Sequence, residues 1–243
     1  PWIDRIFHKP IVYLGCTRQY SKSNWKLYLE NVKDPYHASL LHLFHTTFNI
    51  FRVGMKARSL ADKHHGLHSI ITATKNEVET ADAYKQQEIR SFDEGFSLQD
   101  PSVLGQIKEF EELTTNHIQP IFPQLVVQQI HNTLVARQLL PKGPSNFELV
   151  FHFFGYEDDT PELRALRIKQ ANLVGPAGYI SMEDTEATEL VQRGTARDPD
   201  HCSVIDMARD NPDQEDTLIT ESLIRKFWMG YQKLMGFPSI EKA

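Results

Sequence analysis

The amino-acid sequence predicts an α+β protein in which an antiparallel β-sheet wraps around a long C-terminal helix, in a helix-grip arrangement. Three strand-like runs follow one another at residues 124–131, 133–140 and 146–156, with connections short enough to require antiparallel pairing. Residues 217–234 carry apolar side chains at helical spacing, so one stripe of a long helix should face the sheet. We expect one domain over residues 1–243.

Three shorter segments precede these strands. Residues 11–16 form an apolar run suited to a strand, and residues 66–75 contain another. Residues 52–65 are basic and polar, which is more typical of a mobile loop than of the core. No internal repeat or low-complexity stretch divides the chain, so these segments should belong to the same fold as the central strands.

Two helices flank the central strands in the sequence. Residues 23–45 have apolar side chains at helical spacing, but Pro35 should kink or break that helix. Thr160-Pro161 supplies a capping residue and a first helical residue for a helix that runs to about Leu173. The glycine- and proline-rich residues 175–178 must then interrupt it.

Composition excludes several classes of function. Basic and acidic residues are mixed along a chain of net charge −6, which argues against nucleic acid or an anionic membrane surface as the main partner. No apolar run approaches the roughly 20 residues of a membrane span, and no secretory signal is present. Cys16 and Cys202 cannot form a disulfide framework, so we expect a reduced, cytoplasmic protein. The chain begins at Pro1, from which we expect an N-terminal part to be missing.

His37 and His42 are the densest chemical signal. Five residues apart, they would point about 140° from each other on a regular helix, and a kink at Pro35 could bring them together. Two imidazoles and one carboxylate form the facial triad of non-haem iron(II) oxygenases, which leaves coordination positions open for O₂. Spacing alone leaves the alternative of two structural histidines, because the chain contains eleven.

A resemblance to a family narrows this choice. Two segments resemble the iron-binding segments of Rieske ring-hydroxylating oxygenase α subunits, in the right order: Asn24-Trp25-Lys26-Leu27 with Glu30-Asn31 and Asp34-x-Tyr36-His37-x-x-x-x-His42, and Gly175-Pro176-Ala177-Gly178-Tyr179-Ile180-Ser181-Met182-Glu183-Asp184. The resemblance extends from about Cys16 to Gly236. It implies a mononuclear Fe(II) bound by His37, His42 and Asp184, with Glu183 a less favoured alternative to the aspartate.

The same resemblance assigns electron transfer to Asp34, which matches the family's bridge between the iron and a Rieske cluster in the adjacent subunit. The alternative is a solvent-facing carboxylate. A 2Fe-2S Rieske cluster needs Cys-x-His and Cys-x-x-His pairs, and neither Cys16 nor Cys202 belongs to one. We therefore expect the Rieske domain to be absent from this chain. The family pattern further implies NADH through a separate reductase, a ferredoxin, and a small β subunit in an α3β3 hexamer.

Arg137 is the best candidate for substrate recognition. Strand alternation places it on one face with Val135 and Leu139, which favours a buried arginine that binds a carboxylate over an outward-facing one. The most similar subgroup contains salicylate 5-hydroxylases, anthranilate dioxygenases and terephthalate dioxygenases. An arginine of the last group that grips the para carboxylate is replaced here by Leu218, which argues against a dicarboxylate.

An ortho-substituted monocarboxylate is therefore expected, with O₂ as the co-substrate. Overall resemblance favours salicylate 5-hydroxylase large subunit, with anthranilate 1,2-dioxygenase or another benzoate-type dioxygenase as the alternative. Asn31, Val174 and Met182 are further substrate-binding candidates, transferred from matching family positions.

Other readings remain open. The histidines at 64, 65 and 68 could form a second metal cluster, but a solvated loop is favoured because no cysteine lies near them. A non-enzymatic protein of the same helix-grip architecture could bind an apolar ligand, yet it would have no use for the histidine pair. A zinc hydrolase would need a general base, and no His-Glu-x-x-His motif supplies one.

Overall fold

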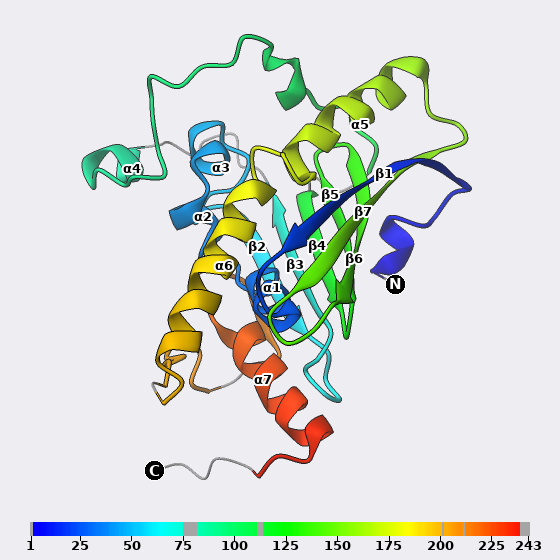
Figure 1. The fold of residues 1–243 in the computed structure, drawn as a ribbon. Helices are drawn as coiled ribbons and strands as arrows, with labels where there is room; N and C mark the ends of the chain where they lie inside the picture. Colours follow the sequence, from blue (N-terminus) through cyan, green and yellow to red (C-terminus); the bar gives the residue numbers. More distant parts are fainter. Residues whose placement is uncertain (1, 75–81, 111–113, 201, 211, 239–243) are drawn as a thin grey trace.

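The computed structural model describes residues 2–74, 82–110, 114–200, 202–210 and 212–238. An antiparallel sheet is at its centre (Figure 1), and its strands are β1 (Ile11–Ser21), β2 (Lys56–Ala61), β3 (Ser69–Thr74), β4 (Thr114–Ile121), β5 (Leu125–Ile130), β6 (Thr133–Pro141), β7 (Phe147–Tyr156) and β8 (Gln214–Glu215). Their order in space is β1-β7-β6-β5-β4-β3-β2-β8. The three central runs are thus a meander, as predicted.

The helices are α1 (Trp25–Asn31), α2 (Ala38–Leu41), α3 (Leu43–Thr47), α4 (Asp82–Gln86), α5 (Pro161–Val174), α6 (Ser181–Arg197) and α7 (Ser222–Met235), with short 3-10 helices at Ile3–Arg5 and Pro101–Leu104. In Figure 1, α1, α6 and α7 lie on one side of the sheet. The main core fills the space between them, with Tyr28 of α1, Val135 of β6 and Phe227 of α7 fully buried together. This confirms the predicted α+β class. No helix among the described residues is long and apolar enough to span a membrane.

The helix predicted over residues 23–45 is broken near Pro35, as expected. Helix α1 ends at Asn31, before Pro35, and α2 and α3 are separate short helices. Strand β1 extends to Ser21, beyond the predicted residue 16, because it pairs with β7 along its whole length, from Ile11 opposite Tyr156 to Ser21 opposite Phe147. The tight turn at residues 131–132 joins β5 to β6 as expected, with His131 in the left-handed region at φ 51°.

The predicted loop at residues 52–65 is wrong in its centre, because β2 occupies Lys56–Ala61. Ala57 and Ser59 point inward and are buried, whereas Lys56 and Arg58 point outward. The strand alternates as half-buried strands do, but its buried residues are small, so they add little to a hydrophobic pattern. Pairing with β3 on one side and β8 on the other supplies its hydrogen bonds.

The C-terminal helix begins five residues later than predicted, at Ser222. The preceding residues make other hydrogen bonds than those of a helix. The Thr217 carbonyl accepts one from Ser59 Oγ, and Thr220 Oγ1 accepts one from the Ser222 N–H. Leu223 and Phe227 of the predicted apolar stripe are buried. Tyr231, one turn later, is partly buried against the main core, whereas Leu234 near the end of the helix is exposed.

Helix α6 was not predicted, although it spans Ser181–Arg197. Its buried face consists of Ser181, Asp184, Thr185 and Thr188 at helical spacing. Polar residues on the inward face leave no apolar periodicity to detect, so hydrophobic patterning could not reveal this helix.

A buried charge network joins α5 to the turn between β5 and β6. Arg167 is 1% exposed, and it donates two hydrogen bonds to the Asp159 carboxylate at 2.8 and 2.9 Å. It also pairs with Glu109 and donates to the Asn132 carbonyl. Both carboxylates are almost fully buried, and Arg167 is the cation that pairs with both of them.

Replacing Arg167 with methionine should lower the free energy of unfolding by about 3–5 kcal/mol, because the two carboxylates would stay buried without a counter-charge. The midpoint of urea unfolding measures this loss. Lys169→Met is the matched control on the same helix, since the Lys169–Asp100 pair is exposed and should contribute less than about 1 kcal/mol. Equal shifts in the two variants would contradict the role given to the buried network.

Candidate metal centre

A tight turn after α1 places the first candidate ligand. The Asp34 Oδ1 atom accepts hydrogen bonds from the backbone N–H groups of Tyr36 at 2.8 Å and His37 at 3.3 Å. Proline at position 35 has no N–H and cannot continue a helix, so the chain turns here. His37 then caps α2, and its carbonyl accepts from the N–H of Leu40 and Leu41.

The backbone at His42 explains how two histidines five residues apart can lie at one site. It lies between α2 and α3 with an extended backbone, at φ −89° and ψ 99°, and is therefore not on a continuous helix with His37. The two imidazole centroids are 5.3 Å apart. The break between two short helices, and not helical periodicity, brings the pair to one site.

Asp184 comes from the first turn of α6 and completes the group. Its Oδ1 atom lies 3.1 Å from His42 Nε2 and 3.4 Å from His37 Nε2. One ligand atom from each of the three residues lies within 4.8 Å of the others, and no further group of this kind is found among the described residues. The structure therefore brings together the three residues that the family resemblance implied.

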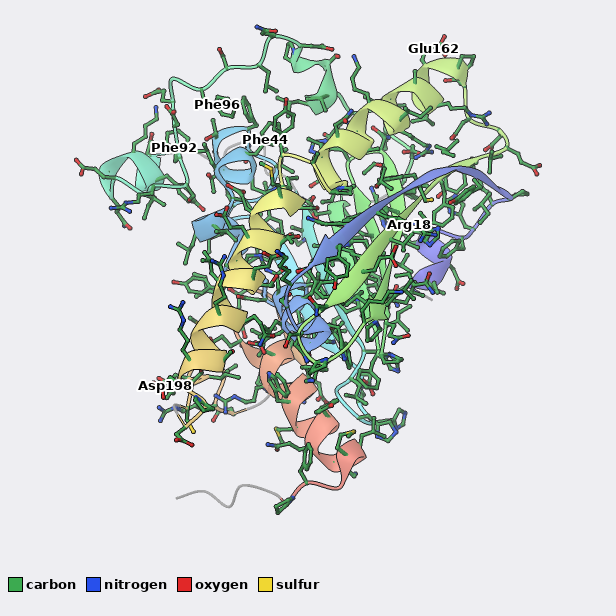
Figure 2. All side chains as sticks on the ribbon, in the orientation of Figure 1. Arg18, Phe44, Phe92, Phe96, Glu162 and Asp198 are labelled. Carbon is green, nitrogen blue, oxygen red and sulfur yellow. The ribbon has the colours of Figure 1, made fainter. Side chains whose placement is uncertain are left out.

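Aromatic contacts hold the segments around these ligands together. Phe44, two residues after His42, stacks on Tyr179, with ring centroids 4.8 Å apart, just before α6 begins. Phe48 of the same region contacts Phe96 at 5.4 Å. Figure 2 shows Phe44 and Phe96 on neighbouring segments above α6. The stacking ties the position of His42 to that of the helix that carries Asp184.

Neighbouring carboxylates orient both imidazoles. The Nδ1 atom of His42 is 2.8 Å from Glu183 Oε2, a hydrogen-bond distance. The Nδ1 atom of His37 is 3.4 Å from Asp34 Oδ2, an ion-pair distance without hydrogen-bond alignment. A carboxylate beside each Nδ1 favours a proton on that nitrogen. This would leave both Nε2 atoms, the ones nearest Asp184 Oδ1, free to bind a metal, which is the usual arrangement around a metal-binding histidine.

Electrostatics at the site favour a cation. Burial disfavours the charged imidazolium, yet Asp184 and Asp34 outweigh it and raise the pKa of His37 to about 10. Burial also acts to lower the pKa of His42, but the neighbouring Asp184 carboxylate outweighs burial and raises this pKa overall. Although Asp184 is buried, the imidazoles hold its pKa well below the usual range. Three carboxylates, those of Asp34, Asp184 and Glu183, thus surround two imidazoles. Protons on the imidazoles compensate this negative charge, and a bound divalent ion could compensate it in their place.

The residues fit a mononuclear iron(II). Two imidazole nitrogens and one carboxylate oxygen are the donor set of the facial triad, and here they lie close enough together to bind one ion. Asn31 Nδ2 lies 3.2 Å from both His37 Nε2 and Asp184 Oδ1, so an amide borders the same point.

A cavity lies beside the three ligands. The apolar part of its lining on the sheet side consists of Ile71, Ile118 and Ile130. Asn31 and Arg137 also line it, as predicted. Arg137 is buried, and its Nη1 donates to the Tyr28 hydroxyl at 2.7 Å, where burial raises the pKa of Tyr28 to about 12.

Two other predicted contacts are not among the lining residues. Val174 is fully buried in the main core, and Met182 on the outer face of α6 is 55% exposed. Three polar lining residues went unnoticed in the sequence: His45, Asn116 and Gln128. Gln128 could have been found by extending the alternation from Arg137 to the neighbouring strand. Asn116 could not, because β4 was not predicted.

The histidines at 64, 65 and 68 do not form a second cluster. The Asp62 carboxylate accepts hydrogen bonds from the backbone N–H groups of all three, which makes a surface turn. His68 Nδ1 accepts from the Phe122 N–H. The preference for a solvated loop agrees with this geometry.

The fold and the site together define a protein with a two-histidine, one-carboxylate centre beside an apolar cavity that holds a buried arginine. Residues 13–236 match the family model described as the ring hydroxylating alpha subunit, catalytic domain. The chain therefore belongs to the ring-hydroxylating α-subunit family and corresponds to its catalytic domain.

Three curated relatives resemble nearly the whole chain. The large subunit of anthranilate 1,2-dioxygenase from Burkholderia cepacia is 81% identical over 98% of the chain. Terephthalate 1,2-dioxygenase, terminal oxygenase component subunit alpha 2, from Comamonas sp. is 46% identical over 96%. The large oxygenase component of salicylate 5-hydroxylase from Ralstonia sp. is 35% identical over 97%. The chain spans 56% of the length of each.

Solved structures share the fold at low identity. Naphthalene 1,2-dioxygenase from Rhodococcus sp. bound to indole superposes with a TM-score of 0.70 at 16% identity, over 93% of this chain and 56% of that one. A quaternary ammonium Rieske monooxygenase superposes with a TM-score of 0.59 at 14% identity, over 92% of this chain and 50% of that one. These likenesses confirm the catalytic-domain fold.

Proposed function

We propose that this chain is the catalytic part of an oxygenase that adds O₂ to the ring of anthranilate (2-aminobenzoate), at an iron(II) held by His37, His42 and Asp184. One observation carries the proposal: the three ligands converge beside a cavity that also contains the buried Arg137. When bound, the iron supplies the activation of O₂ that the side chains cannot provide.

Arg137 is proposed to bind the substrate carboxylate. It is a buried cation with no carboxylate at ion-pair distance among the described residues, and its Nε has no acceptor there. A buried charge without a partner is costly, and a benzoate anion would compensate it through a bidentate pair. The Tyr28 hydroxyl holds the guanidinium in place. The fixed arginine would orient the ring beside the ligands before reaction, which lowers the entropic part of the barrier.

The substrate is proposed to carry one carboxylate. Leu218, where the terephthalate group has a second arginine, is fully buried against an apolar cluster with Ala38 and Phe51, which also line the cavity. A second carboxylate would lie against apolar side chains there. Between the two ortho-substituted candidates, 81% identity to the anthranilate enzyme against 35% to the salicylate enzyme favours anthranilate, the alternative in the sequence prediction.

Products distinguish this reaction from a simple hydroxylation. Hydroxylation of the two carbons that bear the carboxylate and the amine creates a carbon with both hydroxyl and amino groups, which releases ammonia. Loss of carbon dioxide then restores the aromatic ring. Anthranilate, O₂, two electrons and three protons balance to catechol, carbon dioxide and ammonia.

The test is turnover by the complete enzyme that contains this chain, supplied with its electron-transfer partners. We expect oxygen uptake and equimolar ammonia release with anthranilate, and a much lower rate with salicylate. Oxygen uptake with salicylate in preference to anthranilate, or no ammonia, would overturn the proposed substrate.

The electrons are proposed to come from NADH through a separate reductase and ferredoxin, and then from a 2Fe-2S Rieske centre outside this chain. A small β subunit and an α3β3 assembly belong to the same proposal. The relatives' names, large subunit and terminal oxygenase component, are those of parts of larger enzymes. Asp34 is the proposed point of entry, because it contacts His37 and lines a surface hollow on the side of Leu27 and Ile224.

Asp34→Asn in the complete enzyme should lower turnover about 10- to 100-fold while iron content stays unchanged. The amide keeps an acceptor for the N–H groups of Tyr36 and His37, so the turn should survive, but the charge next to His37 is lost. Elemental analysis and steady-state oxygen uptake measure the two quantities. Asp62→Asn is the control, since that carboxylate also caps a turn but neither lines the cavity nor belongs to the ligand group. Unchanged turnover in Asp34→Asn would contradict the bridging role.

A further inference from the structure

The sheet presents one diagonal row of polar side chains to the cavity. Asn116 of β4, Gln128 of β5 and Arg137 of β6 all line it, one from each of three adjacent strands. Gln128 lies opposite Val135, two residues before Arg137, so Gln128 and Arg137 are diagonal neighbours about 7–8 Å apart at their Cα atoms. Ile118 lies opposite Gln128 on the other side, so Asn116 is its diagonal neighbour there. Polar residues in such a row need partners.

The acceptor atom of Gln128 has no such partner among the described residues. Its side chain is 3% exposed, and its Oε1 accepts no hydrogen bond from any residue that the structure describes. Asn116 is better anchored, because its Nδ2 donates to the Ile50 carbonyl at 2.7 Å, although its Oδ1 is also left without a donor. An unpaired buried acceptor is destabilising, and a ligand that donates a hydrogen bond to it would remove this cost.

The position of Gln128 relative to Arg137 determines which atom of a bound ligand could contact Gln128. The ortho position of a benzoate is next to the carbon that carries the carboxylate. A carboxylate on Arg137 can therefore direct its ortho substituent to the adjacent strand, where Gln128 is the polar residue. Asn116 is one strand farther from the arginine, beyond the reach of a group next to the carboxylate.

The number of N–H or O–H bonds on the ortho substituent also determines whether it can donate to Gln128. A primary aromatic amine has two N–H bonds, so one can face its own carboxylate while the other meets an external acceptor. A hydroxyl has one O–H, which its own carboxylate takes. An acceptor beside the carboxylate site thus matches an ortho amine better than an ortho hydroxyl or methyl group.

We propose that Gln128 is the residue that determines specificity for the ortho amino group: its Oε1 accepts an N–H from the amine of a substrate whose carboxylate is bound by Arg137. This assignment rests on the proposed function. Gln128 neither binds the metal nor takes part in the reaction, and its contribution is the choice of substrate.

Gln128→Met in the complete enzyme tests the assignment, because methionine keeps the length of the side chain and removes the acceptor. The readout is the ratio of kcat/KM for anthranilate to kcat/KM for 2-methylbenzoate, whose methyl group has nearly the size of an amine but no N–H. We expect this ratio to fall roughly 5- to 150-fold in the variant, the effect of losing a buried hydrogen-bond partner. Comparing the ratio between variant and wild type cancels the electronic difference between the two substrates.

Gln129→Met is the matched control. Gln129 is the next residue of the same strand on the opposite face, where it accepts from Arg5 and donates to the His131 carbonyl. It should change stability and leave the ratio unchanged. Gln128→Leu repeats the measurement if methionine disturbs folding.

Two failures are distinguishable. An unchanged ratio in both Gln128 variants, with a wild type that turns over anthranilate, overturns the assignment of Gln128 alone. A wild type that releases no ammonia from anthranilate but oxidises another benzoate overturns the proposed substrate, and the assignment with it.

Discussion

The His37→Ala, His42→Ala double variant is expected to purify with almost no iron, whereas the wild-type protein should hold about one iron per chain after anaerobic purification. Asp184 alone would remain of the three ligands, and a single carboxylate cannot retain a metal that two imidazoles helped to bind. These iron contents are those of the chain by itself; in the complete enzyme, whose 2Fe-2S cluster keeps its own iron, the variant should lose about one iron per chain and its turnover should fall to background. Elemental analysis of both proteins gives the answer directly.

The matched control for this variant is His64→Ala, His65→Ala, which removes two exposed imidazoles from the surface turn held by Asp62. Iron content should be unaffected there. Stoichiometric zinc in the wild type, or iron that survives the loss of both His37 and His42, would sink the proposed centre and favour a hydrolase or a ligand-binding protein.

Arg137→Met is expected to have the second largest effect, on substrate recognition. Losing one partner of a buried charge pair costs about 2–5 kcal/mol, which corresponds to roughly a 30- to 4,000-fold lower kcat/KM for anthranilate. Iron content should stay at the wild-type level, because Arg137 lies in the sheet and contacts Tyr28 instead of the ligands. Steady-state kinetics together with elemental analysis separate the two effects.

A neutral substrate provides the control for Arg137. The amide 2-aminobenzamide has no carboxylate, so its already low kcat/KM should change far less in Arg137→Met. Arg137→Lys should fall between the wild type and methionine, since it keeps the charge but loses the bidentate geometry. If the acid and the amide lose the same factor in Arg137→Met, the arginine only shapes the cavity.

Local rules were sufficient wherever one residue type dictates one conformation. Pro35 predicted the break that separates α1 from α2, and Thr160-Pro161 predicted the start of α5. The turns between β5, β6 and β7 are short enough that the meander was the natural arrangement. Arg137 shares its buried face with Val135 and Leu139, as strand alternation required.

Local rules failed where burial involves polar or small side chains. The inward faces of α6 and β2 carry threonines, serines, alanine and an aspartate, so their hydrophobic periodicity is too weak to detect. The same physical cause hid Asn116 and Gln128, whose buried amides look like surface residues in a sequence. Val174 and Met182 illustrate the converse, since positions transferred from relatives did not reach the cavity lining.

The sequence by itself therefore determined the α+β class, the central meander and, through family resemblance, the three candidate ligands that the structure brings together. Tertiary structure alone decided how His37, His42 and Asp184 meet, because a ligand set spread over 148 positions is assembled by an extended residue between short helices and by the first turn of α6. It also decided which polar side chains face the cavity. Sequence spacing reports neighbours along one element, whereas a site depends on the register between strands that are far apart in the chain.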